Sequence, residues 1–238
     1  MQSALSLIYP ARCLLCSSMT EQDFGLCGAC WRETPFIDGL VCGGCGVPLP
    51  GESDGATETC DDCMVIARPW EQGRAALIYR DNGRRLVLGV KHGDRTDIAR
   101  AAAKWLARAG RPFLEPGAII VPVPLHWTRL FRRKYNQSAV LARYLGRETG
   151  NRVEPDALVR VRRTASLGGL TPDERFAAVS DAIRPHPKRG ARLAGQQVIL
   201  VDDVMTSGAT AAAATEAAHL AGAERVCVLH LARAVKGA

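Results

Sequence analysis

Four Cys-x-x-Cys pairs constrain this chain more than any other feature. Eight of its nine cysteines form these pairs, all within residues 1–66. Two residues between cysteines let both thiolates bind one ion from a tight turn, and two such pairs make a tetrahedral sulfur site for zinc. The sequence therefore predicts two zinc sites, with disulfides and an iron–sulfur cluster as the alternatives. The pairs are Cys13/Cys16, Cys27/Cys30, Cys42/Cys45 and Cys60/Cys63.

The lengths of the closed loops indicate how the pairs combine. Joining the first pair to the second and the third to the fourth closes shorter loops than an interleaved arrangement, so we favour it. Four thiolates leave no open position on a zinc ion, which predicts structural sites. The N-terminal residues lack the pattern of a secretory signal peptide, so we expect a cytoplasmic protein, in which paired cysteines are more often metal ligands than disulfides. The ninth cysteine, Cys227, lies in an apolar segment and is expected in the core.

The rest of the chain alternates apolar strand-like segments with amphipathic helical ones. This alternation predicts an α/β domain with a mostly parallel sheet covered on both faces. We therefore expect two domains, a cysteine-rich double zinc ribbon at 1–66 and an α/β domain at 67–238. No apolar run approaches the roughly 18 residues of a membrane span, so none is expected. Strands are predicted at 75–80, 118–124, 195–204 and 225–233, and helices at 82–92, 96–110, 137–150, 207–223 and from Thr171 onward.

The segment VILVDDVMTSGAT, at 198–210, is the most informative part of the predicted α/β domain. An apolar strand leads into Asp202 and Asp203, then into a small polar loop and a helix. This order places the loop at the carboxyl end of a parallel strand, where open α/β sheets bind ligands. Backbone amides at a helix N-terminus bind anions, whereas paired carboxylates suit sugar hydroxyls or magnesium. The loop residues are Thr206, Ser207, Gly208, Ala209 and Thr210.

This segment closely resembles the ribose-5-phosphate loop of type I phosphoribosyltransferases, in which a strand, two acids and a Thr/Ser/Gly-rich loop follow one another. The resemblance implies that Asp202 and Asp203 contact the ribose hydroxyls of phosphoribosyl pyrophosphate. It also implies that residues 206–210 hold the 5-phosphate. The alternative is a plain strand–turn–helix in which the acids have no ligand.

Three further stretches resemble ComF family proteins. They are VKHGDR at 90–95, VPVPLHWTRLFRRKYNQSAVLAR at 121–143 and RVRRTASLGGLTPDERFAAV at 160–179. A double zinc ribbon before a phosphoribosyltransferase-like domain is the layout of that family. The chain departs from the family pattern at Leu167 and Ala178, where glutamine and asparagine are common, but it keeps Asn136 and Gln137.

Basic residues gather in the same stretches, and the net charge of +7 favours an anionic partner. We predict a basic turn that binds pyrophosphate together with magnesium, with Lys91 and Arg95 approaching from the other side. A solvated basic face or a nucleic-acid contact is the alternative. The segment expected to cover the substrate contains Arg162, Arg163 and Arg175. His126 is a weaker candidate for a residue of the site. The basic turn contains Arg129, Arg132, Arg133 and Lys134.

Two functions follow as expectations. As an enzyme, the chain would transfer a phosphoribosyl group to a nitrogen acceptor that the sequence does not identify. As a competence or DNA-uptake module, which the ComF resemblance implies, it would bind single-stranded DNA or competence proteins. Aromatic residues make up only 5% of the chain, so stacking platforms for bases are not evident in the sequence.

Overall fold

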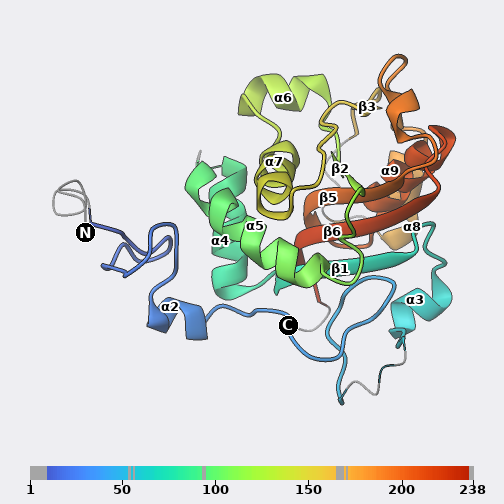
Figure 1. The fold of residues 1–238 in the computed structure, drawn as a ribbon. Helices are drawn as coiled ribbons and strands as arrows, with labels where there is room; N and C mark the ends of the chain where they lie inside the picture. Colours follow the sequence, from blue (N-terminus) through green and yellow to red (C-terminus); the bar gives the residue numbers. More distant parts are fainter. Residues whose placement is uncertain are drawn as a thin grey trace.

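A four-stranded parallel sheet forms the centre of the computed structural model, which describes residues 10–52, 55, 57–92, 95–164, 169 and 171–235. The strand order is β1-β6-β5-β2, so the first strand along the chain pairs with the last (Figure 1). All three pairings are parallel, as the alternation of strands and helices predicts. The strands are β1 (Gln72–Ile78), β2 (Ile119–Pro122), β5 (Gln197–Met205) and β6 (Arg225–Arg233).

Alternate residues of β5 enter two separate cores, because successive side chains of a strand point to opposite faces. Val198 and Leu200 pack on the face covered by α9, whereas Ile199 and Val201 pack on the face covered by α4, α5 and α7. Both faces of the sheet are thus buried, which explains why its strands are nearly continuous apolar runs. The helices are α4 (Asp81–His92), α5 (Thr96–Gly110), α7 (Gln137–Thr149) and α9 (Ala209–Leu220).

The cysteine-rich segment forms two ribbons that pack against different cores. Leu14 of the first ribbon joins the core under α4 and α5. Cys42 and Cys45 of the second ribbon join the core under α9. Each ribbon carries one short helix directly after its third cysteine, α2 (Gly28–Arg32) in the first and α3 (Asp61–Val65) in the second.

The segment between β2 and α7 differs from its sequence prediction. Residues 129–134 were expected to form a turn, but most of them belong to helix α6 (Trp127–Arg133). His126 caps this helix by accepting a hydrogen bond from the Thr128 amide, and Lys134 ends it with a φ of 65°. The arginines therefore lie on a helix, and only Lys134 occupies a turn.

Short elements complete the domain. Strands β3 (Leu158–Arg160) and β4 (Ile183–Pro185) form a two-stranded antiparallel sheet that the sequence does not predict, because each strand has only three residues. Helix α8 (Pro172–Val179) begins with the capping box that Thr171 and Glu174 indicate, and a 3-10 turn, η1 (Gly190–Leu193), precedes β5. Across the described residues, no helix combines the length and apolar character needed to cross a membrane.

Candidate functional site

The acid pair lies at the carboxyl end of β5, where side chains from two other elements hold it. Asp202 Oδ1 accepts hydrogen bonds from the hydroxyl of Ser138 (2.7 Å) and from the Asp203 amide (2.8 Å). Asp203 is 5% exposed; its Oδ2 accepts from Gln137 Nε2 at 3.1 Å and lies 3.4 Å from Lys91 Nζ. Both carboxylates are thus fixed in position before any ligand binds.

The first turn of α7 supplies most of these partners. Asn136 is its N-cap, accepting from the Ser138 amide (3.0 Å) and donating to the Val123 carbonyl (3.1 Å) at the end of β2. This anchor directs Gln137 and Ser138 toward the acids, and Arg133 Nη1 donates to Gln137 Oε1 at 3.3 Å. The sequence singled out Asn136 and Gln137 but missed Ser138. An Asn-Gln-Ser helix start beside the same sheet edge was the signal that could have identified it.

Burial and the neighbouring charge of Asp203 raise the pKa of Asp202 to about 7. Hydrogen bonds from Ser138 and the Asp203 amide, together with the Lys91 charge, act in the opposite direction. Asp202 therefore changes between its neutral and ionised forms near neutral pH, and a bound cation would favour the ionised form.

This raised pKa predicts how stability depends on pH. The unfolded chain ionises Asp202 near its ordinary value of 3.8, so the folded protein holds an extra proton between about pH 4 and pH 7. The stability that this group contributes is present at low pH and is lost as the pH rises through 7. Because Asp202→Asn cannot ionise, we expect it to gain on the order of 2–3 kcal/mol relative to wild type between pH 5 and pH 8. Urea titrations of both proteins at the two pH values measure this; an unchanged difference would contradict the raised pKa.

The loop after β5 turns sharply into α9. Gly208 is the N-cap and has a φ of 88°, a conformation that residues with a Cβ rarely adopt. The carbonyls of Thr206 and Ser207 accept hydrogen bonds from arginines at 2.7 Å, Arg233 and Arg68 respectively. The first turn of a helix leaves backbone amides without intrahelical partners, and such a turn binds anions.

A small hollow of about 20 Å³ lies inside this loop, beside Asp202 and His230. His230 is 2% exposed; burial, aided by the Arg233 charge, lowers its pKa to about 3. Its Nδ1 has no hydrogen-bond partner among the described residues. The hollow is therefore lined by a neutral imidazole, which the sequence did not identify because no motif surrounds it.

The basic residues predicted from sequence are only partly brought together. Lys91 pairs with Asp203, and Arg133 reaches the acids through Gln137. Arg129 donates to the Thr164 carbonyl at 2.9 Å. Arg95 lies elsewhere, since it pairs with Asp97 at 2.7 Å.

Arg160, which no sequence motif identifies, is a further basic residue near the acid pair. Arg160 donates to Thr164 Oγ1 at 2.7 Å. Burial, followed by the charge of Arg129, lowers its pKa, whereas the charge of Asp202 raises it. Arg160 is therefore a further, half-buried cation whose charge acts on Asp202.

The remaining predicted residues have separate positions. Arg162 donates to the Ser180 carbonyl, whereas Arg175 lines a cavity beside the loop that also borders Arg68 and Arg233. Cys227 is fully buried in the core, as expected. Leu167 and the side chain of Arg132 lie outside the described residues.

The eight paired cysteines form two clusters with the sequential pairing favoured from the sequence. In each, the four sulfurs lie within 4.8 Å of one another, as a zinc ion with Zn–S bonds of about 2.3 Å requires. The two clusters have the same internal hydrogen bond. The Cys27 amide donates to Cys13 Sγ in the first cluster and the Cys60 amide donates to Cys42 Sγ in the second, both at 3.3 Å. These are structural zinc sites, and their shared geometry reveals a repeat that the sequence shows only as Cys-x-x-Cys. The clusters are Cys13/Cys16/Cys27/Cys30 and Cys42/Cys45/Cys60/Cys63.

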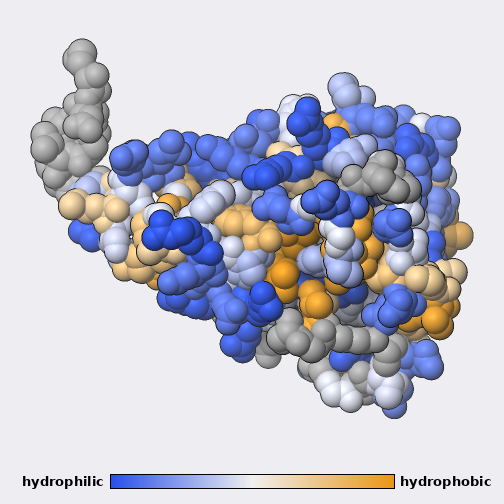
Figure 2. Space-filling view, turned by 90° about the horizontal axis from the view of Figure 1, so that it is seen from below, coloured by the Kyte–Doolittle hydropathy of each residue, from blue (hydrophilic) through white to orange (hydrophobic). Residues whose placement is uncertain are grey.

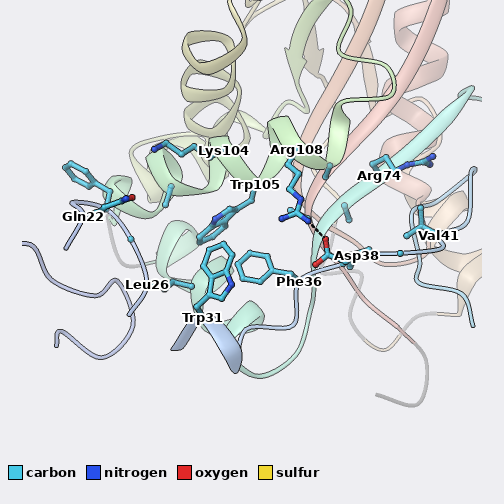
Figure 3. Close-up of a pocket in the computed structure, with 18 of the residues that line it drawn as sticks. Gln22, Leu26, Trp31, Phe36, Asp38, Val41, Arg74, Lys104, Trp105 and Arg108 are labelled. Atoms are coloured by element: carbon cyan, nitrogen blue, oxygen red, sulfur yellow. Dashed lines mark hydrogen bonds and ion pairs between the residues drawn. The ribbon is translucent and has the colours of Figure 1, made fainter. Parts of the chain in front are cut away.

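A second hollow, of about 500 Å³, lies between the first ribbon, the segment after α2 and helix α5 (Figure 3). Trp31 and Phe36 pack with ring centroids 4.4 Å apart, and Phe36 meets the edge of Trp105 at 5.4 Å. At its rim, Arg108 pairs with Asp38 at 2.8 Å. The face that carries the ribbons is hollowed and apolar in its middle, with hydrophilic residues around it (Figure 2).

Comparisons with known proteins cover both parts of the chain. A family model described as a double zinc ribbon domain matches residues 4–64. The chain is 30% identical over 237 residues to the DNA utilization protein YhgH of Escherichia coli K12, covering 95% of this chain and 99% of that protein. It is 27% identical over 229 residues to competence protein F of Haemophilus influenzae, covering 94% and 97%. Among solved structures, glutamine phosphoribosylpyrophosphate amidotransferase from B. subtilis has a TM-score of 0.41 and 17% identity, over 61% of this chain and 30% of that one.

Proposed function

Because the chain belongs to the ComF family of competence and DNA-utilization proteins, we propose that it binds phosphoribosyl pyrophosphate, or a related sugar phosphate, with magnesium. One observation carries this proposal. Two carboxylates, anchored by Ser138, Gln137 and Lys91, lie at the end of β5 directly before a loop that opens a helix. This arrangement offers acceptors for sugar hydroxyls and donors for a phosphate at adjacent positions.

The acid pair, the loop and three of the predicted basic residues each have a role in this proposal. Asp202 and Asp203 accept hydrogen bonds from the ribose hydroxyls. The loop holds the 5-phosphate with hydroxyls and backbone amides. Lys91, Arg129 and Arg133 would contact the pyrophosphate, since Lys91 pairs with Asp203 and Arg133 contacts Gln137, which binds the same acid. The loop residues are Thr206, Ser207, Gly208, Ala209 and Thr210.

As a transferase, the protein would move the phosphoribosyl group to a nitrogen acceptor. The bond between C1 of the ribose and the pyrophosphate oxygen breaks, a bond from C1 to nitrogen forms, and the nitrogen loses a proton. Magnesium, when bound, neutralises charge on the leaving pyrophosphate. The chain's own contribution is to orient the sugar and to place cations near the leaving group.

Two measurements test this proposal in sequence. We expect phosphoribosyl pyrophosphate with magnesium to raise the melting temperature, because a ligand that binds only the folded state stabilises it. If the melting temperature does not change, the site assignment is wrong. If it rises, pyrophosphate release in the presence of a panel of nitrogen acceptors distinguishes a transferase from a ligand sensor.

A second function, the binding of single-stranded DNA, is favoured by the aromatic hollow. Although aromatic residues are few in the sequence, Trp31, Phe36 and Trp105 gather there, and Trp31 is 44% exposed. Lys104 and Arg74 line the same hollow and would face a phosphate backbone. A base can stack on an exposed ring while cations contact the strand.

This second function predicts a specific loss on substitution of the exposed ring. We expect Trp31→Ala to weaken binding of a labelled oligothymidine roughly tenfold at fixed salt, because stacking contributes about 1–3 kcal/mol per base. Trp127→Ala is the matched control, since that tryptophan is 68% exposed on α6 outside the hollow. Fluorescence anisotropy measures both. Equal affinities for the two variants would exclude the hollow as the DNA site.

The family's layout also supports the remaining expectations. We propose that residues 1–66 and 67–238 are the two units of the chain, and that the protein works in the cytoplasm, where thiolates stay available for zinc. Competence proteins are its proposed protein partners.

A further inference from the structure

Two arginines connect the second cysteine cluster to the loop proposed to hold the 5-phosphate. Arg68 donates from Nε to Cys63 Sγ (3.3 Å) and from Nη1 to the Ser207 carbonyl (2.7 Å). Arg233 donates from Nη2 to Cys45 Sγ (3.8 Å) and from Nη1 to the Thr206 carbonyl (2.7 Å). Each guanidinium thus touches a zinc ligand on one side and the loop backbone on the other.

The residues that follow the second ribbon also pack directly against the loop. A Cβ added to Gly208 would lie 2.8 Å from Arg68 Nη1 and 3.0 Å from Trp70 Cη2. Trp70 is 4% exposed and donates from its ring nitrogen to the Gly44 carbonyl at 2.5 Å, within the third Cys-x-x-Cys pair. The turn at Gly208 therefore has its shape set partly by residues that follow the ribbon.

Charge makes this connection depend on the metal. A zinc ion held by four thiolates is a net anion, whereas four protonated thiols are neutral and are weak hydrogen-bond acceptors. Arg233 is only 4% exposed, and a buried cation is costly unless an opposite charge accompanies it. The loaded cluster supplies that charge for both arginines, so it stabilises the arrangement in which they hold the two loop carbonyls.

The first cluster has no such connection among the described residues. Arginines do tie its ribbon to the domain, but their targets are the carbonyls of Leu14 and Leu15, bound by Arg95 and Arg85. No hydrogen bond joins this ribbon to residues 206–210 within the described part of the chain. The chain therefore carries an internal control for any effect of zinc on the loop.

We propose that zinc in the second cluster positions the loop at residues 206–210. Arg68 and Arg233 are the positioning residues, because they connect the zinc ligands to the backbone of this loop. The metal-loaded ribbon holds the carbonyls of Thr206 and Ser207 outward, which leaves the first turn of α9 in the conformation that receives a phosphate. The ligand part of this inference rests on the proposed function; the effect on the loop does not.

The first test follows the loop without any ligand. Cys60→Ser empties the second cluster but leaves the sulfurs of Cys45 and Cys63 in place, and Cys27→Ser is its equivalent in the first cluster. Relative to exchange in the buried strand β6, we expect amide hydrogen exchange at residues 206–210 to accelerate at least tenfold in Cys60→Ser and to stay unchanged in Cys27→Ser. A released loop opens more often, whereas a loss of global stability accelerates exchange in both segments. Equal exchange in the two variants would overturn the proposal.

A second pair of variants keeps all eight zinc ligands, in case Cys60→Ser does not fold. Arg68→Ala removes one bridge, whereas Arg85→Ala removes an arginine that contacts the first ribbon. Exchange at the loop should increase only in Arg68→Ala. No increase in that variant would contradict the bridging role.

The third test uses reciprocity. If zinc strengthens ligand binding, the ligand must strengthen zinc binding by the same factor. With phosphoribosyl pyrophosphate and magnesium, we expect one of the two zinc ions to leave for a chromogenic chelator about tenfold more slowly, and this protection to disappear in Arg68→Ala but not in Arg85→Ala. Binding to the wild type without any protection would refute the coupling, whereas no binding at all would refute the proposed function and leave the exchange test to decide the coupling.

Discussion

A chain in which Asp202 and Asp203 are both replaced by alanine will no longer be stabilised by phosphoribosyl pyrophosphate with magnesium. For the wild type, a ligand at one hundred times its Kd adds about 2.7 kcal/mol, which raises the melting temperature of a chain of this size by roughly 5–10 °C. Asp202 lines the small hollow inside the loop, Asp203 is the next residue, and the two carboxylates are the proposed acceptors for the ribose and the cation. Removing them leaves the loop to hold the phosphate alone, so the shift should vanish at the same ligand concentration.

The unliganded variant should still fold. The pKa of Asp202 is raised by burial and by Asp203, which means that the acid pair is held at an energetic cost. A suitable control replaces two acids elsewhere, Asp38→Ala with Asp156→Ala, since both pair with arginines outside the site. This control should keep the full shift in differential scanning fluorimetry. A double variant at the acid pair that retained the shift would place the ligand elsewhere.

Loss of zinc from the second cluster will destabilise the whole chain, whereas loss from the first will open one ribbon. Cys45 is 1% exposed in the core beneath α9, whereas Cys16 is exposed. Structural zinc contributes about 10–16 kcal/mol in isolated zinc fingers, so even a part of this exceeds the margin of a typical domain. We expect Cys45→Ser to lower the free energy of unfolding by about 5 kcal/mol or more, and Cys16→Ser to leave the main transition nearly unchanged.

Elemental analysis and denaturant titration check this expectation together. The wild type should contain about two zinc ions per chain, and each variant about one, because each cluster has four ligands. A wild type with almost no zinc would contradict both sites. If the two substitutions lowered the free energy of unfolding equally, both ribbons would stabilise the domain to the same extent. That result would contradict the expectation drawn from the different burial of Cys45 and Cys16.

Much of this architecture was visible in the sequence because local signals agree with the global fold. The segments at 96–110 and 225–233 have the bounds of α5 and β6, since one is an amphipathic run closed by glycine and the other a continuous apolar run. The four Cys-x-x-Cys pairs gave both zinc sites with their ligands. The helix at Trp127–Arg133 was missed because prolines before it and many arginines within it resemble a turn.

The contacts between distant segments could not be predicted. Arg68 and Ser207 are 139 positions apart, and Arg233 and Cys45 are 188 positions apart. Neither arginine lies in a motif, and its partner in the loop is a backbone carbonyl, a group that every residue has. Arg160 was missed for the same reason, because its role depends on its proximity to Asp202 rather than on its sequence neighbours.

The pairing of β1 with β6 has a consequence for the order in which the protein can be made. The ribosome releases β1 early, together with the segment around Phe36 that bridges to it, but its partner in the sheet is β6, the last strand of the described residues. β1 therefore joins the sheet only after β6 has emerged. The same late strand carries Arg233, which completes the contact with the second cluster. The ribbons can bind metal while synthesis continues. The sheet is completed only afterwards, when β1 pairs with β6 across nearly the full length of the domain.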